Sequence, residues 1–276
     1  MREIPREAIL AELNGLEGSY GLYVEDLHSG DLFEIHPELV LPSASIIKVP
    51  MLALLLKDAA DGLVDLNEPQ VIAEKNRVGG TGVLYELDRD YHPTLYTAAK
   101  LMVVLSDNTC TNHIMDLIGI ERFNAFWAEQ GYPSFRLMRK TMDWAEIAKG
   151  KNNFLHVRDA GRLLSAIARR ELFSAEICDT IMRIMRKQYY NDLLPALIPA
   201  VPSYAPPEDH EHIAEGCVGV AHKTGGLPRL QHDAGIFTLP DGRQYVIAML
   251  TANLQRDVDG AEAIRHVSRL VYEALC

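Results

Sequence analysis

The chain has 276 residues, of which 48% are hydrophobic, so it can bury a sizeable core in one large domain or in two intertwined subdomains. Its 38 acidic residues against 27 basic residues give a formal net charge of −11, and the sequence contains no basic run, which excludes nucleic acid as an expected partner. The longest apolar run, from Val49 to Leu56, is too short to span a bilayer, so we expect no membrane role either.

The N-terminal segment MREIPREAILAELNGLEG alternates charged and apolar residues and predicts an amphipathic helix over residues 4 to 15. It lacks the basic start and the apolar stretch of a secretory signal peptide. From the sequence as written we therefore expect a cytoplasmic protein, or a secreted or periplasmic one if Met1 replaces a cleaved leader.

The next segments, SYGLYVEDL and DLFEIHP, predict two strands that are joined by a turn at residues 28–30. A long helical region follows, with an apolar helix after Ser45 and further helices at 95–105, 107–119, 121–130, 157–169 and 172–186. Residues 200–216 form a polar, proline-bearing loop. Strand patterns then return in CVGVAHKT, DAGIFTL and QYVIAMLT, before a closing helix over 261–275.

This order of elements predicts an α+β fold of one domain, residues 1–276, with an antiparallel sheet. The strands at the two ends of the chain must come together, so the sheet subdomain comprises about residues 1–42 and 217–276. The helical subdomain, about residues 43–216, is inserted between them. A cleft between sheet and helices is the natural place for an active site.

The cysteines and histidines indicate neither a metal site nor a cofactor. The four cysteines are widely spaced without a CxxC pair, and we expect free thiols at Cys110, Cys178, Cys217 and Cys276. His210 and His212 have HxH spacing, but no third ligand is evident, so exposed loop histidines are the preferred interpretation. We expect no metal and no cofactor.

The segment PSASIIKVP places Ser45 and Lys48 three residues apart at the start of an apolar helix, on one helical face. A serine there can be a simple helix cap. The buried ammonium of Lys48 is harder to explain, because burial without partners is costly and lowers the pKa of a lysine toward that of a useful base.

Two further triplets have ordinary structural explanations when each is taken alone. SDN, at Ser106, Asp107 and Asn108, fits an N-cap before a helix, and KTG, at Lys223–Gly225, fits the end of a strand. Taken together and in this order, S-x-x-K, S-D-N and K-T-G form the signature of class A β-lactamases and penicillin-binding proteins.

The chain therefore resembles the class A β-lactamase-related family of serine hydrolases, from about residue 15 to the C-terminus. The segments GGTGVL and HDAGIFTLPDGRQYVIAMLT add to the resemblance. It implies a β-lactamase/transpeptidase-like fold, with a five-stranded antiparallel sheet flanked by helices and an inserted all-helical subdomain.

The resemblance also implies the roles of the motif residues. Ser45 would attack the carbonyl carbon, Lys48 would take or relay its proton, and Ser106 would pass a proton to the leaving nitrogen. The substrate-binding residues would be Asn108 for an amide, Lys223 and Thr224 for a carboxylate, and Gly225 and Gly226 beside them. The oxyanion would be bound by the backbone N–H of Ser45 and by that of Gly226 or Leu227.

One part of the family pattern is missing. Class A β-lactamases carry a glutamate, in an E-x-x-L-N context, that activates the deacylating water. The equivalent stretch here, MRKTMDWAEIAKGKNNFLHVRD, has no such pattern and offers Glu146 and Asp143 as possible deacylation bases, with Asn152 and Asn153 nearby. An exposed, solvated carboxylate is the alternative interpretation of each.

Four more residues are expected near the cleft without an assigned role. His222 and His232 could shape the packing of the strands, Arg229 could reach a substrate carboxylate, and Trp144 could cover the cleft or simply pack.

The function we predict is a serine hydrolase that forms an acyl-enzyme, with β-lactam hydrolysis as the leading activity. The alternatives are a D-Ala-D-Ala peptidase or esterase on the same scaffold, and a slow-turnover penicillin-binding sensor. The expected partner is a small β-lactam, amide or ester substrate, and the sequence does not indicate an oligomeric state.

Overall fold

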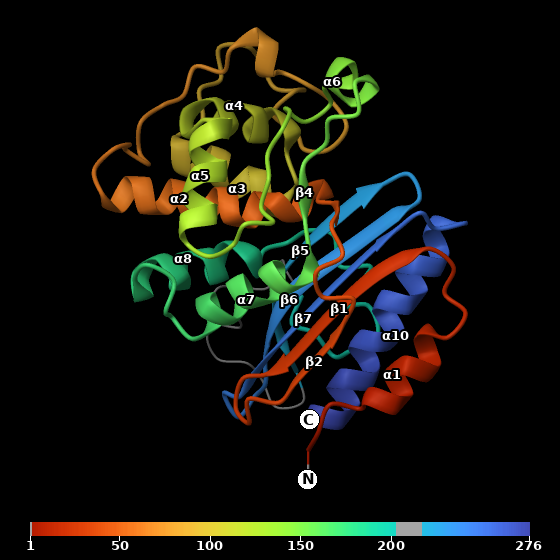
Figure 1. The fold of residues 1–276 in the computed structure, drawn as a ribbon. Coiled ribbons are helices and arrows are strands. Elements are labelled where there is room, and N and C mark those ends of the chain that lie inside the picture. The colour runs from red at the N-terminus through yellow and green to blue at the C-terminus, as the bar shows by residue number, and fades with distance from the viewer. Residues whose placement is uncertain (1, 203–216) are drawn as a thin grey trace.

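The computed structural model describes residues 2–202 and 217–276, and its centre is a five-stranded antiparallel sheet in the order β2-β1-β7-β6-β5 (Figure 1). The strands are β1 (Ser19–Asp26), β2 (Leu32–Ile35), β5 (Gly219–Leu227), β6 (Leu230–Thr238) and β7 (Gln244–Ala252). Strand β1 pairs with β7 in the register Tyr23↔Ala248, which joins the two ends of the chain into one sheet. A separate two-stranded ladder joins β3 (Leu41–Pro42) to β4 (Phe154–Leu155).

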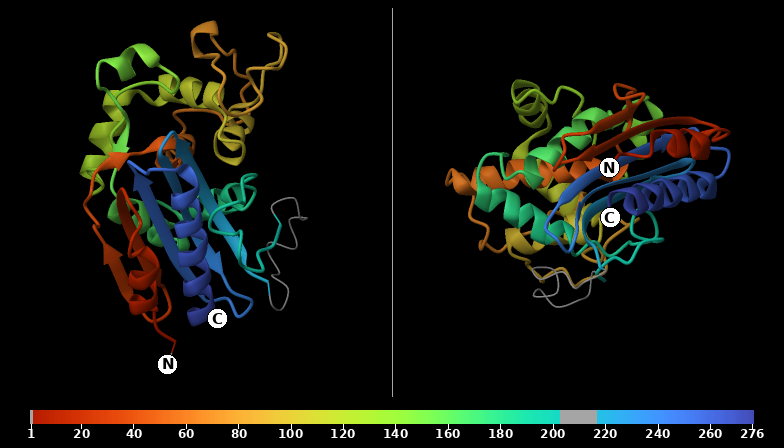
Figure 2. Two further views of the ribbon diagram at one scale, coloured as in Figure 1. Left: turned by 90° about the vertical axis from the view of Figure 1, so that its right-hand side faces the viewer. Right: turned by 90° about the horizontal axis from the view of Figure 1, so that it is seen from below.

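The helices divide between the sheet and the inserted subdomain (Figures 1 and 2). The helices that pack on the sheet are α1 (Arg6–Leu13), α7 (Val157–Ala168), α8 (Ala175–Met185) and α10 (Asp257–Leu275). The others are α2 (Lys48–Ala60), α3 (Leu95–Val104), α4 (Asn108–Ile118), α5 (Ile120–Glu129) and α6 (Trp144–Ala148), with short 3₁₀ helices η1 (Ala44–Ile47) and η2 (Glu74–Asn76). In the described part of the chain, no helix combines the length and the apolar character that crossing a membrane requires.

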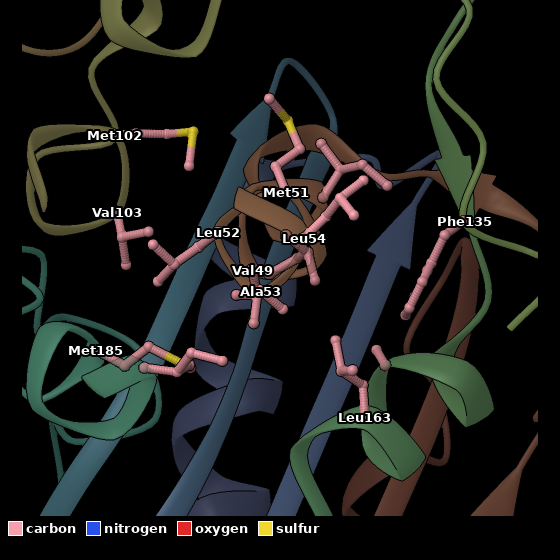
Figure 3. Close-up of a cluster of buried hydrophobic side chains, with 14 of the residues drawn as sticks. Val49, Met51, Leu52, Ala53, Leu54, Met102, Val103, Phe135, Leu163 and Met185 are labelled. Carbon is pink, nitrogen blue, oxygen red and sulfur yellow. The ribbon is translucent and has the colours of Figure 1, made fainter. Parts of the chain in front are cut away.

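The alternation of side chains along the strands separates two cores. Leu22 and Val24 of β1 face α1 and α10, whereas Tyr23 faces the larger core that also contains α2, α7 and α8. Helix α2 lies at the centre of that larger core, where Val49 and Leu52 are surrounded by side chains of α3, α7 and α8 (Figure 3). The burial of residues 49–56 on all sides explains why this part of α2 is apolar around its circumference, whereas Lys57 near its end is partly exposed.

The sequence predicted the main elements, and most of them differ from the structure only at their ends. The helix expected at 172–186 begins at Ala175, because the side chain of Ser174 caps it by accepting a hydrogen bond from the backbone N–H of Ile177. The α-helix expected from Ser45 begins only at Lys48, because residues 44–47 form a 3₁₀ turn. Strands β3 and β4 and helix α6 were not predicted.

Helix α7 and strand β1 approach each other closely at Gly161. A Cβ atom at this position would lie 2.2 Å from the ring of Tyr23, so a methyl group has no room. We expect Gly161→Ala to lower the free energy of unfolding by about 1–3 kcal/mol, in spite of the better helix propensity of alanine. Urea unfolding measures this change. Gly79→Ala is the control, since a Cβ there would meet nothing within 4 Å, and an equal loss in both variants would contradict the packing argument.

The expectations for cysteine and histidine have different outcomes. All four cysteines are free thiols in the structure. His210 and His212 lie outside the described residues. Among residues 2–202 and 217–276, no group of three His, Cys, Asp or Glu side chains converges in a way that could hold a metal ion.

Candidate active site

A cleft of about 410 Å³ opens between the sheet and the inserted helices, with a size typical of small-molecule sites. Its walls come from η1, strand β5 and three segments that connect helices. The lining residues are Ser43, Ala44, Ser45, Gly80, Thr81, Ser106, Asn108, Arg139, Thr141, Met142, Trp144, Ile147, Asn152, Asn153, Tyr190, Asp192, Leu193, Thr224, Gly225, Gly226, Leu227 and Gln231.

Ser45, Ser106 and Lys48 form a hydrogen-bonded chain at the base of this cleft. The Ser106 hydroxyl donates to the Ser45 hydroxyl at 2.8 Å, and the Lys48 ammonium donates to the Ser106 hydroxyl at 3.1 Å. The ammonium also donates to the backbone oxygen of Ser106 at 2.7 Å and to Oδ1 of Asn108 at 3.1 Å. Lys48 therefore reaches Ser45 through Ser106, although the sequence placed Lys48 as the direct neighbour of Ser45.

Lys48 is almost completely buried, with 1% of its surface exposed. Burial is the main cause that lowers the pKa of its amine well below the usual value, and the positive charge of Lys223 lowers it further. Asp107 acts in the opposite direction. The lowered pKa favours the neutral amine, which can accept a proton.

The backbone of Ser106 is held in an unfavourable conformation. Its φ of 54° lies in the left-handed region, which costs free energy for a residue with a side chain. Two hydrogen bonds to its backbone oxygen hold it there, one from Lys48 and one from the Thr81 hydroxyl at 2.6 Å. This conformation points the Ser106 hydroxyl at Ser45.

The segment Gly79–Gly82 packs directly on the SDN triplet, and its glycines make this contact possible. A Cβ on Gly82 would lie 2.3 Å from the Asp107 side chain, and Gly82 has a φ of +100°. The Asp107 carboxylate accepts from the backbone N–H groups of Val83, Leu84 and Cys110, so it caps α4 and fixes the glycine segment at the same time. Asn108 donates to the backbone oxygen of Gly79 at 3.1 Å.

Strand β5 forms the opposite wall. Thr224, Gly225 and Gly226 line the cleft, and a Cβ on Gly225 would lie 3.1 Å from the backbone nitrogen of Ser45, so the strand and η1 nearly touch. Lys223 is fully buried behind this wall and donates to the backbone oxygen of Thr224 at 2.8 Å. Burial lowers the pKa of Lys223 to about 7, against the opposing charge of Asp233.

The two histidines of the sheet take part in structural hydrogen bonds. His222 Nδ1 lies 2.9 Å from Oδ1 of Asp233, and both residues are buried next to Lys223. His232 Nε2 lies 2.8 Å from the backbone oxygen of Pro42. The Arg229 side chain donates to the backbone oxygen of Leu254 at 2.6 Å and is not among the lining residues, so the structure does not bring it to the cleft.

The segment 138–153 forms the remaining wall and is closed at its two ends by Asn153. The Asn153 side chain accepts from the backbone N–H groups of Met138 and Arg139 and donates to the backbone oxygen of Arg139. The backbone oxygen of Asn153 accepts from Ser43 N at 2.8 Å, which ties this wall to the approach of Ser45.

The two carboxylates expected as possible deacylation bases lie in this segment but do not line the cleft. Asp143 accepts from the backbone N–H of Glu146 and caps α6. The Glu146 carboxylate forms ion pairs with Lys149 and Lys151, and chiefly the hydrogen bonds from these two lysines lower its pKa to about 2. Trp144, the first residue of α6, is 66% exposed and lines the cleft. The base role of Asp143 or Glu146 stays a prediction.

The structure also brings residues to the cleft that the sequence did not single out. Among them are Thr81, Arg139, Thr141, Tyr190, Asp192 and Gln231. Of these six, all but Gln231 come from connecting segments, where no hydrophobic period or motif marks the direction of a side chain. The GGTG run was the one available signal, since closely spaced glycines indicate a close approach of the backbone.

Comparisons with known proteins agree with this geometry. A model described as the Beta-lactamase enzyme family matches residues 5–275. The chain is 26% identical to a protein named Beta-lactamase from Bacteroides uniformis, over 95% of this chain and 88% of that protein.

Two solved structures are also similar. PBP-A is 31% identical with a TM-score of 0.84, covering 98% of this chain and 94% of its own. A β-lactamase from Sphaerobacter thermophilus DSM 20745 is 25% identical with a TM-score of 0.82, covering 98% of this chain and 96% of its own.

Proposed function

The chain belongs to the β-lactamase enzyme family, whose members are hydrolases that act on β-lactams, and we propose that it opens the β-lactam ring through an acyl-enzyme on Ser45. This confirms the family and the fold that the sequence predicted. The observation that carries the mechanistic proposal is the hydrogen-bonded chain from Ser45 through Ser106 to Lys48 at the base of the cleft. A solved PBP-A variant, 30% identical to this chain, is an acyl-enzyme complex with penicillin-G.

In acylation, the proton of Ser45 passes along this chain as its oxygen attacks the carbonyl carbon. With Lys48 as a neutral amine, the polarity of the chain reverses, so that Ser45 donates to Ser106 and Ser106 donates to Lys48. The C–N bond of the lactam then breaks, and the proton returns through Ser106 to the leaving nitrogen. Lys48 thus acts on Ser45 through Ser106, in accordance with the contacts in the structure.

The walls of the cleft bind the rest of the substrate. The backbone N–H of Ser45 and one from the Gly226–Leu227 end of β5 would stabilise the oxyanion. The Thr224 hydroxyl and the charge of Lys223 would bind the carboxylate of a penicillin, and Asn108 would bind its side-chain amide. The close contact between Gly225 and η1 supports this arrangement, because it holds both donors beside the nucleophile.

The charge of Lys223 predicts a pH dependence of acylation. The ammonium attracts the substrate carboxylate only when it is protonated, and its pKa is about 7, so kcat/KM should fall as the pH rises above about 7. In Lys223→Arg the guanidinium stays charged, and this alkaline decrease should disappear. Acylation rates with penicillin-G between pH 5 and pH 9 measure the effect. An alkaline decrease at the same pH in both proteins would assign it to another group.

Hydrolysis of the acyl-enzyme needs a base for the attacking water. If Glu146 or Asp143 is that base, Glu146→Gln or Asp143→Asn should slow the decay of the acyl-enzyme by about 10²–10⁴-fold, because general-base catalysis contributes this much. The decay is followed by mass spectrometry after a pulse of penicillin-G. Unchanged decay in both variants would remove segment 138–153 as the source of the base.

Turnover of nitrocefin, a chromogenic β-lactam, tests the function as a whole. Sustained colour development with the purified protein is the expected result. A stable adduct without turnover would instead favour a peptidase-like enzyme or a penicillin-binding sensor. No reaction at all would contradict the proposal and direct the search to small esters and amides.

A further inference from the structure

A buried arginine stands in the wall of the cleft. Arg139 is 8% exposed and is the one basic side chain among the described residues that line the cavity. Its guanidinium donates to the backbone oxygen of Lys140 at 2.8 Å and to Oδ1 of Asn152 at 2.7 Å. Both acceptors are neutral, so neither of them cancels the positive charge.

Within the described part of the chain, no carboxylate forms an ion pair with this guanidinium. Among the residues that the structure describes, its buried Nε–H has no hydrogen-bond partner, and no ion pair includes Arg139. The charge of the Asp143 carboxylate raises the pKa of Arg139, but this carboxylate caps α6 and accepts no hydrogen bond from the guanidinium. Burial lowers the pKa of Arg139, which shows that the surroundings disfavour the charge more than they stabilise it.

Closure of segment 138–153 does not require a charge at this position. Asn153 already joins the two ends of the segment with three hydrogen bonds to residues 138 and 139. The two contacts of the Arg139 guanidinium add to this closure, but a neutral amide could make contacts of the same kind. The structural role of Arg139 therefore does not explain why this residue carries a positive charge.

The position of Arg139 in the cleft indicates which part of a substrate could meet it. The penicillin carboxylate is attached to the part of the molecule that carries the leaving nitrogen, and it is assigned above to Thr224 and Lys223 on β5. The acyl substituent extends from the other side of the carbonyl group. Arg139 belongs to the wall formed by segment 138–153, which is separate from β5.

We propose that Arg139 is a specificity-determining residue that attracts a negatively charged group on the acyl substituent, so that the cleft favours β-lactams with a second carboxylate. This inference rests on the proposed function, because it assumes that the acyl group is bound at Ser45. A guanidinium in a partly desolvated cleft binds a carboxylate through strong, charge-assisted hydrogen bonds. Such a carboxylate would also supply the neutralising charge that the guanidinium lacks.

Carbenicillin and benzylpenicillin are suitable probes, since they differ by one carboxylate on the acyl substituent. The readout is the ratio of their second-order acylation rate constants, carbenicillin over benzylpenicillin, measured by intact mass spectrometry. We expect Arg139→Gln to lower this ratio about tenfold, which corresponds to the loss of one charge-assisted contact. Arg139→Lys should keep it within about threefold of the wild type, because the charge remains.

Asn152→Asp is a second, independent variant, so the proposal can still be tested if Arg139→Gln does not fold. It places a carboxylate at the acceptor that now lies 2.7 Å from the guanidinium, so Arg139 is neutralised while its hydrogen bond is kept. The ratio should again fall about tenfold. A ratio that is unchanged or higher in both variants would overturn the proposal and leave Arg139 with a structural role.

The same experiment separates this inference from the proposed function. Acylation of the wild type by benzylpenicillin tests the function alone. If benzylpenicillin does not acylate the wild type, the proposed function fails, and calorimetric affinities of the two compounds for the wild type and Asn152→Asp then decide whether Arg139 selects the carboxylate.

Discussion

Ser45→Ala is expected to abolish covalent labelling by penicillin-G and to lower any remaining hydrolysis by at least about 10⁴-fold, because removal of the nucleophile leaves only binding and oxyanion stabilisation. The variant should fold normally, since a hydroxyl at the surface of the cleft is lost and the 3₁₀ turn around it stays. Intact mass spectrometry after incubation with penicillin-G shows the adduct directly.

Ser29→Ala is a matched control, because Ser29 lies in the turn between β1 and β2, its hydroxyl donates to Asp26, and it is not among the residues that line the cleft. It should be labelled like the wild type. Full labelling of Ser45→Ala would show that another nucleophile carries the acyl group.

Replacement of Lys48 is expected to have the second largest effect. In Lys48→Ala, acylation by penicillin-G should slow by about 10²–10⁴-fold, because the proton of Ser45 has no base at the end of the chain through Ser106. The change also removes one of the two donors to the backbone oxygen of Ser106, where the Thr81 hydroxyl remains, and the Lys48 donor to Oδ1 of Asn108. Stopped-flow acylation kinetics measure the rate, and thermal unfolding shows how much stability is lost.

Lys57→Ala is the control for this variant, since Lys57 lies on the same helix α2 and forms an ion pair with Asp61 at the protein surface. Its acylation rate should be unchanged. A rate in Lys48→Ala close to that of the wild type would show that another group accepts the proton of Ser45.

The motifs and the order of elements predicted the fold because both are carried by local patterns. The segments SYGLYVEDL and QYVIAMLT marked β1 and β7, and the apolar run from Val49 to Leu56 marked a buried helix. The 3₁₀ turn at residues 44–47 could not be predicted in this way. It depends on a strand ladder between residues 41–42 and 154–155 and on the hydrogen bond from Ser43 to Asn153, which join segments far apart in the sequence.

The chemistry of the site was predictable only in part for the same reason. The spacing of Ser45 and Lys48 suggested direct contact, but Ser106 lies between them, because its left-handed backbone turns the hydroxyl toward Ser45. Arg139 carries no motif, and its proposed role depends on the absence of a carboxylate partner among the described residues, which only the packed structure reveals. The possible base at Asp143 or Glu146 stays a prediction.

The pairing of β1 with β7 also determines how the protein can fold during synthesis. Strand β1 leaves the ribosome early, but its partner follows more than two hundred residues later in the register Tyr20↔Thr251. The helices between them are stabilised by hydrogen bonds between residues close in the sequence and can form in the meantime, whereas long-range strand pairing is slow. We therefore expect the nascent chain to expose an unpaired strand β1 until strand β7 emerges, so that the cleft is completed only after strands β5 to β7 have been synthesised.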